Sequence, residues 1–278
     1  KNLETYLRKK FRKNEFWEVQ CPLISPEKVW TASGHLGRFY DYIVECTNEV
    51  CQNLFRADTL LDQLGIEYDE LSPERLTALI QEKNITCPQC QSPLSEVREQ
   101  NLMVTSQLGL PPKEFILRPE TATTTYLQFP RLYNHFRTKM PIRVFQMGYA
   151  FRNEISPRNM LLRTREFEQC EGQLFITPDQ EQKFDDYEDI VDETVKILSA
   201  DMQINGEKEA SNITIQEAVA QGLFQKPAYA WLIWLAYDIV KELGNPVENI
   251  RLRQHRSDEK AHYAEDAWDL EMRSKIYG

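Results

Sequence analysis

The spacing of apolar side chains predicts where helices and strands lie. Helices are expected over residues 2–13, 57–64, 73–83, 121–129, 179–202, 214–221, 227–244 and 258–267. Alternating or short apolar runs predict strands over residues 16–21, 115–118, 143–151, 163–175 and 250–254. These elements are segregated and do not alternate as βαβ units. The expected fold class is therefore α+β, an antiparallel sheet flanked by helices.

Composition narrows the possible functions. Hydrophobic residues make up 41% of the 278 residues, enough for a sizeable core, and 33 basic against 43 acidic residues give a formal net charge of −10. This balance excludes a free-standing basic nucleic-acid binder, although a local basic patch could still hold a polyanion. The N-terminal segment has no apolar signal region, and the longest apolar stretch, residues 228–240, is too short to span a bilayer. We expect a cytoplasmic protein without membrane segments.

Four of the six cysteines fall within residues 46–99, a charged stretch that we interpret as an inserted module. They form two close pairs, Cys46 with Cys51 and Cys87 with Cys90, which could supply four thiolates to a tetrahedral zinc ion. The alternative is four unrelated reduced thiols. Cys21 and Cys170 lie in predicted strands and are expected to be core thiols. The four histidines have no metal-ligand spacing and are interpreted as ordinary surface or core residues.

The segment of residues 151–175 predicts a long hairpin with an eight-residue loop and a cluster of arginines. In an acidic chain this cluster is either a local anion site or one half of a set of surface ion pairs with neighbouring glutamates. Strand alternation places Arg163, Arg165, Phe167 and Gln169 on one face. An aromatic ring beside arginines suits a purine nucleotide, whose base stacks on the ring while its phosphates meet the guanidinium groups.

These residues resemble a known family. FRNE at 151–154 followed by RTREF at 163–167 is similar to motif 2 of class II aminoacyl-tRNA synthetases. The resemblance narrows to glycyl-tRNA synthetases of the homodimeric archaeal and eukaryotic type through further segments in the same order. They are VWTASGH (29–35), FRADTL (55–60), CPQC (87–90), NLMV (101–104), LRPETA (117–122) and RLRQH…AHYAEDAWDLE (251–271).

The resemblance implies a domain layout. Residues 1–45 would form the first part of the catalytic core, with motif 1, and residues 46–99 the inserted zinc-binding module. Residues 100–278 would form the second part, with the motif 2 hairpin and a helical insertion, and would stop before motif 3 and the anticodon-binding domain. A homodimer formed through the first helix and the strand that ends at Pro22 is also implied.

The resemblance further implies ATP-dependent activation of glycine and transfer of the glycyl group to tRNA(Gly). Arg152, Glu154 and Arg163 would be catalytic, with Arg152 on the α-phosphate, Glu154 near the adenine and Arg163 toward the outer phosphates. Phe167 would stack on the adenine, and Mg²⁺ would bridge phosphates. The implied ATP-binding set is Arg152, Asn153, Glu154, Leu162, Arg163, Thr164 and Phe167.

Glycine binding is implied for a second set of residues. Glu120 and Glu171 match the carboxylates that bind the ammonium group, and Arg56 matches an arginine at the amino-acid end. Phe167 and Gln169 complete the implied glycine site. From the residues alone, Glu120 could equally serve in the first turn of a helix, where a carboxylate favours the helix dipole.

Two departures from the family pattern keep a second interpretation open. Thr123 and Thr124 stand where the family usually has Gln-Gly, and Gln173 stands at a position that is often acidic. A catalytically inactive synthetase-like module, used for binding or assembly, is therefore the alternative to an active ligase.

Overall fold

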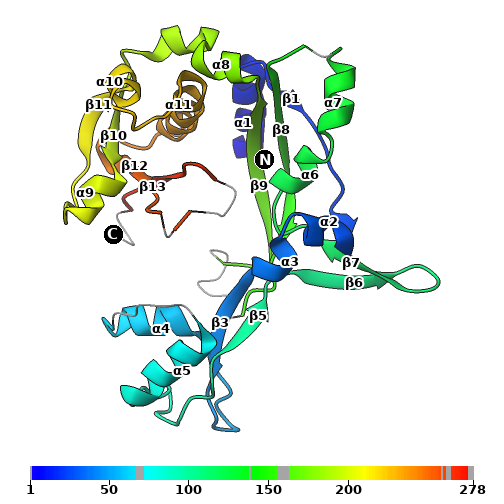
Figure 1. Cartoon of the computed structure of the whole chain (residues 1–278), viewed down its shortest axis with the longest axis vertical. Coiled ribbons are helices and arrows are strands. Elements are labelled where there is room, and N and C mark those ends of the chain that lie inside the picture. Colours follow the sequence, from blue (N-terminus) through cyan, green and yellow to red (C-terminus); the bar gives the residue numbers. More distant parts are fainter. Residues whose placement is uncertain are drawn as a thin grey trace. The chain divides into compact units, whose positions relative to one another are not determined.

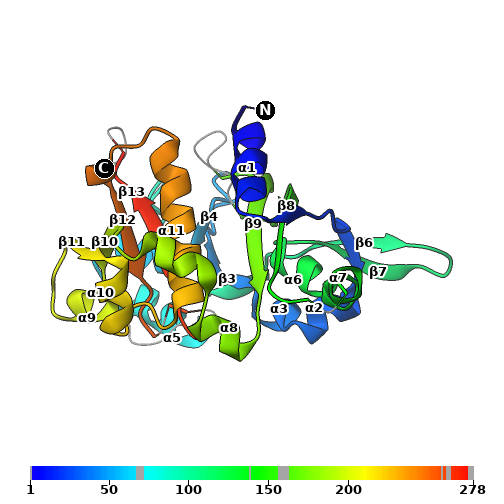
Figure 2. The same cartoon turned by 90° about the horizontal axis from the view of Figure 1, so that it is seen from above.

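The computed structural model describes residues 2–66, 72–137, 139–155, 163–257, 259–260 and 264–274. The chain forms two compact units (Figures 1 and 2). Unit 1 contains Lys1–Phe16, Phe136–Arg143 and Leu174–Gly278, and unit 2 contains Trp17–His135 and Val144–Gln173. Among the described residues, no helix is both long and apolar enough to cross a bilayer.

Unit 1 is built around a four-stranded mixed sheet. Its order is β11 (Ser211–Thr214), β10 (Thr194–Leu198), β12 (Ile250–Gln254) and β13 (Trp268–Met272); β10 and β12 run parallel, and the other pairs are antiparallel. The helices of this unit are α1 (Asn2–Lys13), α8 (Pro178–Gln182), α9 (Ala200–Ile204), α10 (Ile215–Ala220) and α11 (Pro227–Glu242), with 3-10 turns at Asp185–Ile190 and Val247–Asn249.

The core of unit 1 forms where α11 presents its aromatic face. The ring of Trp231 stacks on Phe16 at a centroid distance of 6.1 Å and packs on Phe184 at 5.2 Å. The guanidinium of Arg143 lies 4.9 Å from the centroid of Trp231, a cation–π contact. Of the aromatic residues of this helix, Trp231 and Tyr237 are buried core residues, whereas Tyr229 and Trp234 are partly exposed.

Unit 2 contains three three-stranded sheets. They join β1 (Trp17–Glu18), β8 (Ile142–Phe151) and β9 (Glu166–Phe175); β2 (Ile24–Pro26), β7 (Lys113–Leu117) and β6 (Val104–Leu108); and β4 (Leu54–Arg56), β3 (Tyr40–Glu45) and β5 (Arg98–Asn101). Its helices are α2 (Glu27–Ala32), α3 (His35–Arg38), α4 (Ala57–Gln63), α5 (Pro73–Glu82), α6 (Ala122–Tyr126) and α7 (Phe129–His135). Helix α5 begins as predicted, since the Ser72 hydroxyl accepts a hydrogen bond from the Arg75 N–H.

The cysteine-bearing part of unit 2 has an apolar core of its own. Side chains from β3, β4, α4 and α5 bury one another, among them Val44, Phe55, Leu61 and Leu76. Strand β3 pairs with both β4 and β5, so the sheet connects the two ends of this segment. The cysteine pairs are carried on a folded scaffold and not on a bare loop.

Several sequence predictions are wrong in detail. The predicted helix over 179–202 is instead α8, a 3-10 turn, strand β10 and α9. The β-branched residues Thr194, Val195 and Ile197 favour a strand, and Ser199 caps a new helix after it. The predicted helix over 121–129 is shorter than expected: α6 ends at Tyr126, and α7 begins at Phe129 with Pro130 in its first turn. Two strand pairs, β1–β8 and β10–β12, are parallel, so the sheets are not all antiparallel.

Two further expectations are corrected. Of residues 258–267, those that the structure describes are not helical, and of residues 16–21 only Trp17–Glu18 is a strand. Cys21 is buried as expected, but Cys170 is exposed. Cys170 lies on β9, where alternate side chains point to opposite faces and not every position is covered.

Candidate active site

Glu120 lies in the turn before helix α6, and one of its carboxylate oxygens is held from two elements. Oε1 accepts hydrogen bonds from the Thr123 backbone N–H at 3.2 Å and the Thr123 hydroxyl at 2.6 Å. Nε2 of His35 lies 3.4 Å from the same oxygen. Burial alone would raise the pKa of Glu120, but the contacts with His35 and Thr123 outweigh it and lower the pKa. Glu120 is therefore ionised at neutral pH.

Glu171, on strand β9, is tied to the same turn. Its Oε2 accepts a hydrogen bond from the Thr121 hydroxyl at 2.5 Å, and its Oε1 accepts one from the Gln173 amide at 3.0 Å. The Thr121 backbone N–H donates to Oε1 of Gln169 at 3.2 Å. Glu120 and Glu171, the two predicted ammonium-binding carboxylates, thus belong to one hydrogen-bonded cluster, which we call the acidic cluster.

Charge compensation in the acidic cluster is incomplete. Within the part of the chain that the structure describes, neither Glu120 nor Glu171 forms an ion pair with a lysine or arginine, although the buried Arg118 guanidinium interacts electrostatically with Glu171 without such a pair. The amide oxygen of Gln173 is buried there and has no hydrogen-bond partner among the residues that the structure describes. Buried acceptors without donors and carboxylates without cations are costly. The cluster is suited to a small ligand with a positive charge and several N–H donors, such as an ammonium group.

The turn that carries the acidic cluster is supported by a buried arginine. Arg118 is 2% exposed, and its guanidinium donates to Oε1 of Gln146 and to the carbonyl oxygen of Tyr149, both at 2.8 Å. The amide of Gln146 in turn donates to the carbonyl oxygen of Thr121 at 2.7 Å. Burial lowers the pKa of Arg118 from its usual value. These bonds fix the backbone between the two carboxylates.

Arg152 follows strand β8 and supplies a positive charge next to this turn. Its guanidinium carbon lies 5.3 Å from the ring centroid of Phe39 and 5.2 Å from that of Phe167. Its Nε donates to the carbonyl oxygen of Pro119, the residue before Glu120, at 3.1 Å. Among the described residues, no carboxylate pairs with Arg152. A stacked, unneutralised guanidinium is an anion site of the kind that phosphates use.

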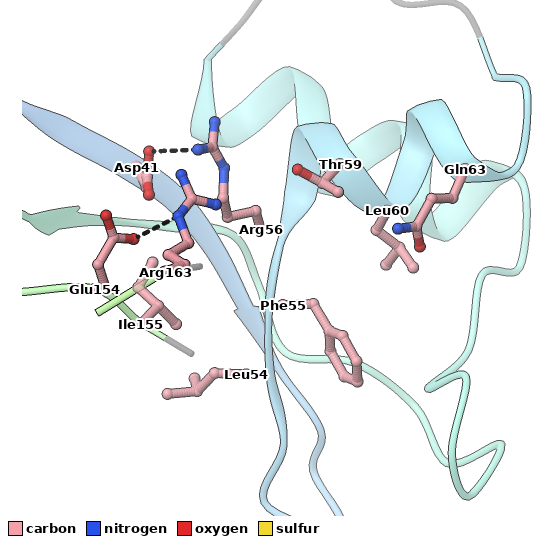
Figure 3. Close-up of a pocket in the computed structure, with 10 residues that line it drawn as sticks. All are labelled: Asp41, Leu54, Phe55, Arg56, Thr59, Leu60, Gln63, Glu154, Ile155 and Arg163. Carbon is pink, nitrogen blue, oxygen red and sulfur yellow. Dashed lines mark ion pairs between the residues drawn. The ribbon is translucent and has the colours of Figure 1, made fainter. Parts of the chain in front are cut away.

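A pocket with about 520 Å³ of empty space, part of it open to solvent, lies beside the motif 2 strands. Figure 3 shows four charged side chains gathered together, with Leu54 below them and Phe55 and Leu60 to their right. One charged pair joins Nε of Arg163 to Oε2 of Glu154 at 3.2 Å. Arg163 is about half exposed, so solvent weakens this pair and an anion could displace Glu154 from it.

The second charged group in the pocket is centred on Arg56. Arg56 pairs with Asp41 at 3.3 Å and with Asp58 at 2.5 Å. The bond to Asp58 raises the pKa of Arg56, while burial raises the pKa of Asp41 despite its arginine partner. Arg56 therefore lies with Glu154 and Arg163, and among the described residues it has no recorded contact with Glu120 or Glu171. Its expected role in glycine binding stays a prediction.

The remaining predicted nucleotide residues are placed as follows. The Asn153 backbone N–H donates to the carbonyl oxygen of Leu102 at 2.8 Å, and the Thr164 hydroxyl donates to the carbonyl oxygen of Glu166 at 2.5 Å. Leu162 lies outside the described residues. The Arg152 guanidinium packs on one face of the Phe167 ring, so a purine base would stack on the opposite face.

Sequence reasoning missed four residues of this site. His35, Thr121, Thr123 and Gln173 all contact the predicted carboxylates. Their spacing carries no metal or catalytic signal, because each acts through a turn or a strand pairing. The one available signal was that all four fall within or beside the segments that resemble the family, where Thr123 and Gln173 stand out only as departures from its pattern.

The four cysteine sulfurs meet at one point, all within 4.8 Å of one another. Sγ of Cys46 lies 3.3 Å from that of Cys90, and Sγ of Cys51 lies 3.8 Å from that of Cys87. Tetrahedral zinc with Zn–S bonds of about 2.3 Å would place its sulfurs about 3.8 Å apart. The side-chain amide of Asn53 donates to Cys51 Sγ at 3.0 Å, a bond suited to a thiolate. The residues present therefore fit a structural zinc ion.

An acidic cluster suited to a cationic ligand thus lies next to an arginine that stacks between two aromatic rings. Residues 110–264, more than half of the chain, match the family described as the tRNA synthetase class II core domain (G, H, P, S and T). The chain belongs to this family.

The particular relatives are glycine–tRNA ligases, as the resemblance predicted. The chain is 38% identical over its whole length to those of Thermococcus sibiricus and Pyrococcus furiosus, and 37% identical over 96% of its length to that of Methanocaldococcus jannaschii. It spans 48%, 49% and 47% of these proteins, about half of their length. Among solved structures, a pyrrolysyl-tRNA synthetase of Desulfitobacterium hafniense is 13% identical with a TM-score of 0.44, over 98% of this chain and 54% of that one.

Proposed function

We propose that this chain is the catalytic core of a glycine–tRNA ligase, which activates glycine with ATP and passes the glycyl group to tRNA(Gly). The observation that carries the proposal is the acidic cluster: Glu120 in the turn before α6 and Glu171 on β9 are linked through Thr121, and among the described residues neither forms an ion pair with a lysine or arginine. The unneutralised guanidinium of Arg152 is bonded to Pro119, directly before Glu120. A cation site and an anion site therefore adjoin, as aminoacyl-adenylate formation requires.

The proposed chemistry assigns a role to each group. The glycine carboxylate attacks the α-phosphorus of ATP, a new P–O bond forms, and pyrophosphate leaves. Arg152 stabilises the charge that builds on the α-phosphate. Arg163 would leave its ion pair with Glu154 and bind the outer phosphates of ATP. The oxygens of these phosphates would also bind Mg²⁺. A ribose hydroxyl of tRNA(Gly) then takes the glycyl group, and AMP leaves.

Selection of glycine would depend on the steric exclusion of larger amino acids more than on favourable contacts with glycine. An additional methyl group in an apolar pocket changes binding by only about 1–3 kcal/mol. Alanine therefore has to be rejected by a steric clash close to the two carboxylates. Thr121 and Thr123, which contact Glu171 and Glu120, are side chains of the cluster that could provide this clash.

Zinc and assembly complete the proposal. A zinc ion held by Cys46, Cys51, Cys87 and Cys90 would stabilise the fold and leave no open position for catalysis. A homodimer through α1 and the strand near Pro22, and a cytoplasmic location, are proposed from the family resemblance.

A second candidate is a catalytically inactive synthetase-like module used for binding or assembly. Two departures from the family pattern favour it, because both now contact the proposed ammonium-binding carboxylates. The Thr123 hydroxyl donates to Glu120, and the Gln173 amide donates to Glu171. Internal donors of this kind could take the place of the substrate.

Glycine-dependent ATP–pyrophosphate exchange separates the two candidates. It is measured on this chain and on a longer polypeptide that spans the full length of the relatives. We expect exchange with glycine and not with alanine in the longer polypeptide, and its loss in Glu120→Gln. A longer polypeptide that folds and binds ATP but shows no glycine-dependent exchange contradicts the ligase and supports the binding module.

A further inference from the structure

Glu120 presents its two carboxylate oxygens in different ways. Oε1 receives the Thr123 N–H at 3.2 Å, the Thr123 hydroxyl at 2.6 Å and Nε2 of His35 at 3.4 Å. Among the described residues, no contact is recorded for Oε2. All three donors therefore converge on one oxygen, and the other is left for a ligand.

The imidazole of His35 is held firmly from its other side. Its ring lies 5.4 Å from that of the buried Trp30 and 6.1 Å from that of Phe39, both in edge-to-face geometry. Its Nδ1 lies 2.9 Å from the hydroxyl of Ser33. Aromatic packing and the Ser33 contact together fix the plane of the ring.

The hydrogen bonds at Nδ1 bear on whether Nε2 of His35 turns a hydrogen or a lone pair toward Glu120. If the Ser33 hydroxyl donates to Nδ1, the neutral imidazole carries its hydrogen on Nε2. If Ser33 instead donates to the carbonyl oxygen of Trp30, from which it lies 3.2 Å, Nδ1 carries a hydrogen. A neutral ring in that second arrangement would turn a lone pair toward the lone pairs of the Glu120 carboxylate, which is unfavourable. The first arrangement avoids this repulsion and directs the Nε2 hydrogen at Oε1.

We propose that His35 and Thr123 are positioning residues that hold Oε1 of Glu120, so that Oε2 faces the ammonium group of the amino-acid substrate. This inference rests on the proposed function and names two residues that act through Glu120. Thr123 contributes from the first turn of α6, and His35 contributes from the start of α3. A carboxylate fixed in advance loses less side-chain freedom when the substrate binds, which favours affinity.

The test compares two ligands on the full chain. One is 5′-O-sulfamoyl adenosine, and the other is its nonhydrolysable glycyl derivative, glycyl sulfamoyl adenosine. We define the Kd ratio as the Kd of sulfamoyl adenosine divided by the Kd of its glycyl derivative. This ratio isolates the contribution of the glycyl end, because the nucleotide part is common to both ligands. We expect the chain to prefer the glycyl compound.

His35→Phe keeps the aromatic packing but removes the donor, and Thr123→Val keeps the shape but removes the hydroxyl. Each is expected to lower the Kd ratio by about tenfold, the loss of one charge-assisted hydrogen bond, while the Kd of sulfamoyl adenosine stays within about twofold. His35→Gln and Thr123→Ser, which restore a donor, should recover most of the ratio. Thr31→Val, which removes an exposed helix hydroxyl, is the matched control.

The outcomes are distinct. An unchanged ratio in both Phe and Val variants, or an equal loss for both ligands, overturns the positioning roles and indicates a purely structural effect. A wild-type chain that binds both compounds equally contradicts glycine recognition, so that the proposed function fails and the positioning roles fail with it. Should His35→Phe not fold, Thr123→Val and its Ser rescue decide the question alone.

Discussion

A Cβ atom on Gly148 would lie 2.6 Å from Nη2 of Arg118. Strand β8 therefore needs a residue without a side chain where it passes the buried guanidinium. Arg118 cannot move aside easily, because it is 2% exposed and holds both Gln146 and the carbonyl oxygen of Tyr149. The glycine and the arginine together support the turn that carries Glu120.

Gly148→Ala should consequently destabilise the protein by about 1–3 kcal/mol, the usual cost of overpacking a closed site. Gly37→Ala is the matched control, since nothing lies within 4 Å of its added Cβ and helix α3 favours alanine. Chemical denaturation of both variants measures the difference. Equal midpoints for the two would show that Arg118 gives way without cost.

Asp58→Asn should weaken the protein in a pH-dependent manner. Burial would raise the pKa of Asp58, but hydrogen bonds from Arg56 and Thr59 hold it below its usual value. Because the folded pKa is depressed, the stabilisation is present above the unfolded pKa of about 3.9 and disappears as pH falls through the lower folded value.

We expect a loss of about 1–2 kcal/mol at pH 7, since Arg56 keeps Asp41 as a partner, and a difference that diminishes as the pH falls below the unfolded pKa and through the lower folded one. Asp62→Asn, on the exposed face of the same helix, is the control and should change little at any pH. Urea denaturation at several pH values provides the measurement. A difference that persists undiminished at low pH would mean that packing, and not charge, is lost.

Arg152→Lys should weaken ATP binding although it preserves the charge. A lysine cannot stack between Phe39 and Phe167 or offer paired planar donors to a phosphate. We expect the Kd of a nonhydrolysable ATP analogue to rise by about tenfold or more, the value of one charge-assisted bond. Arg98→Lys, in an exposed pair with Glu45, should leave that Kd unchanged. Calorimetric titration that finds equal affinity in Arg152→Lys and wild type would remove Arg152 from the nucleotide site.

The sequence predicts the local parts of this structure well and the long-range parts less well. Helices α5, α10 and α11 carry their own start signals and lie within a residue or two of expectation. Strand β10 was missed because its apolar residues also fit a helical period, and only its pairing with β11 and β12 decides otherwise. Where the apolar spacing fits both a helix and a strand, the secondary structure depends on pairing with strands far away in the sequence, which the spacing does not reveal.

In the candidate site, too, the sequence predicts individual residues but not the long-range contacts between them. The family resemblance named Glu120 and Glu171, whereas the turn that joins them is visible only in the fold. Thr121 bonds Glu171 across 50 positions of sequence, and His35 reaches Glu120 from another helix. Neither contact leaves a spacing that a sequence pattern could detect.

Zinc content offers an independent prediction. The four-sulfur geometry leads us to expect about one zinc ion per chain, and removal by a chelator should lower the melting temperature. Cys51→Ser and Cys87→Ser should each abolish tight binding, while Cys170→Ser, at an exposed cysteine outside the cluster, should retain it. Elemental analysis with thermal unfolding makes the measurement. Metal-free protein with the same melting temperature in all three variants would mean that the cluster is merely four reduced thiols.

Unit 1 contains a buried ion pair whose disruption should be severe. Lys10 of α1 is 6% exposed and pairs with Asp238 and, at 2.8 Å, with Glu242 of α11. Lys10→Met leaves two carboxylates facing an apolar side chain, and removing one partner of a buried pair costs about 3–5 kcal/mol. Lys9→Met, one position away and exposed, should be nearly neutral.

A double-mutant cycle shows whether the loss of stability in Lys10→Met comes from the carboxylates that it leaves without a cation. If it does, Lys10→Met combined with Asp238→Leu should recover much of the stability lost by Lys10→Met alone, because an apolar pair replaces the charged one. Denaturation midpoints of the single and double variants provide the coupling. Strictly additive losses would indicate instead that Lys10 contributes through the packing of its aliphatic stem along α11, and that its charge matters little.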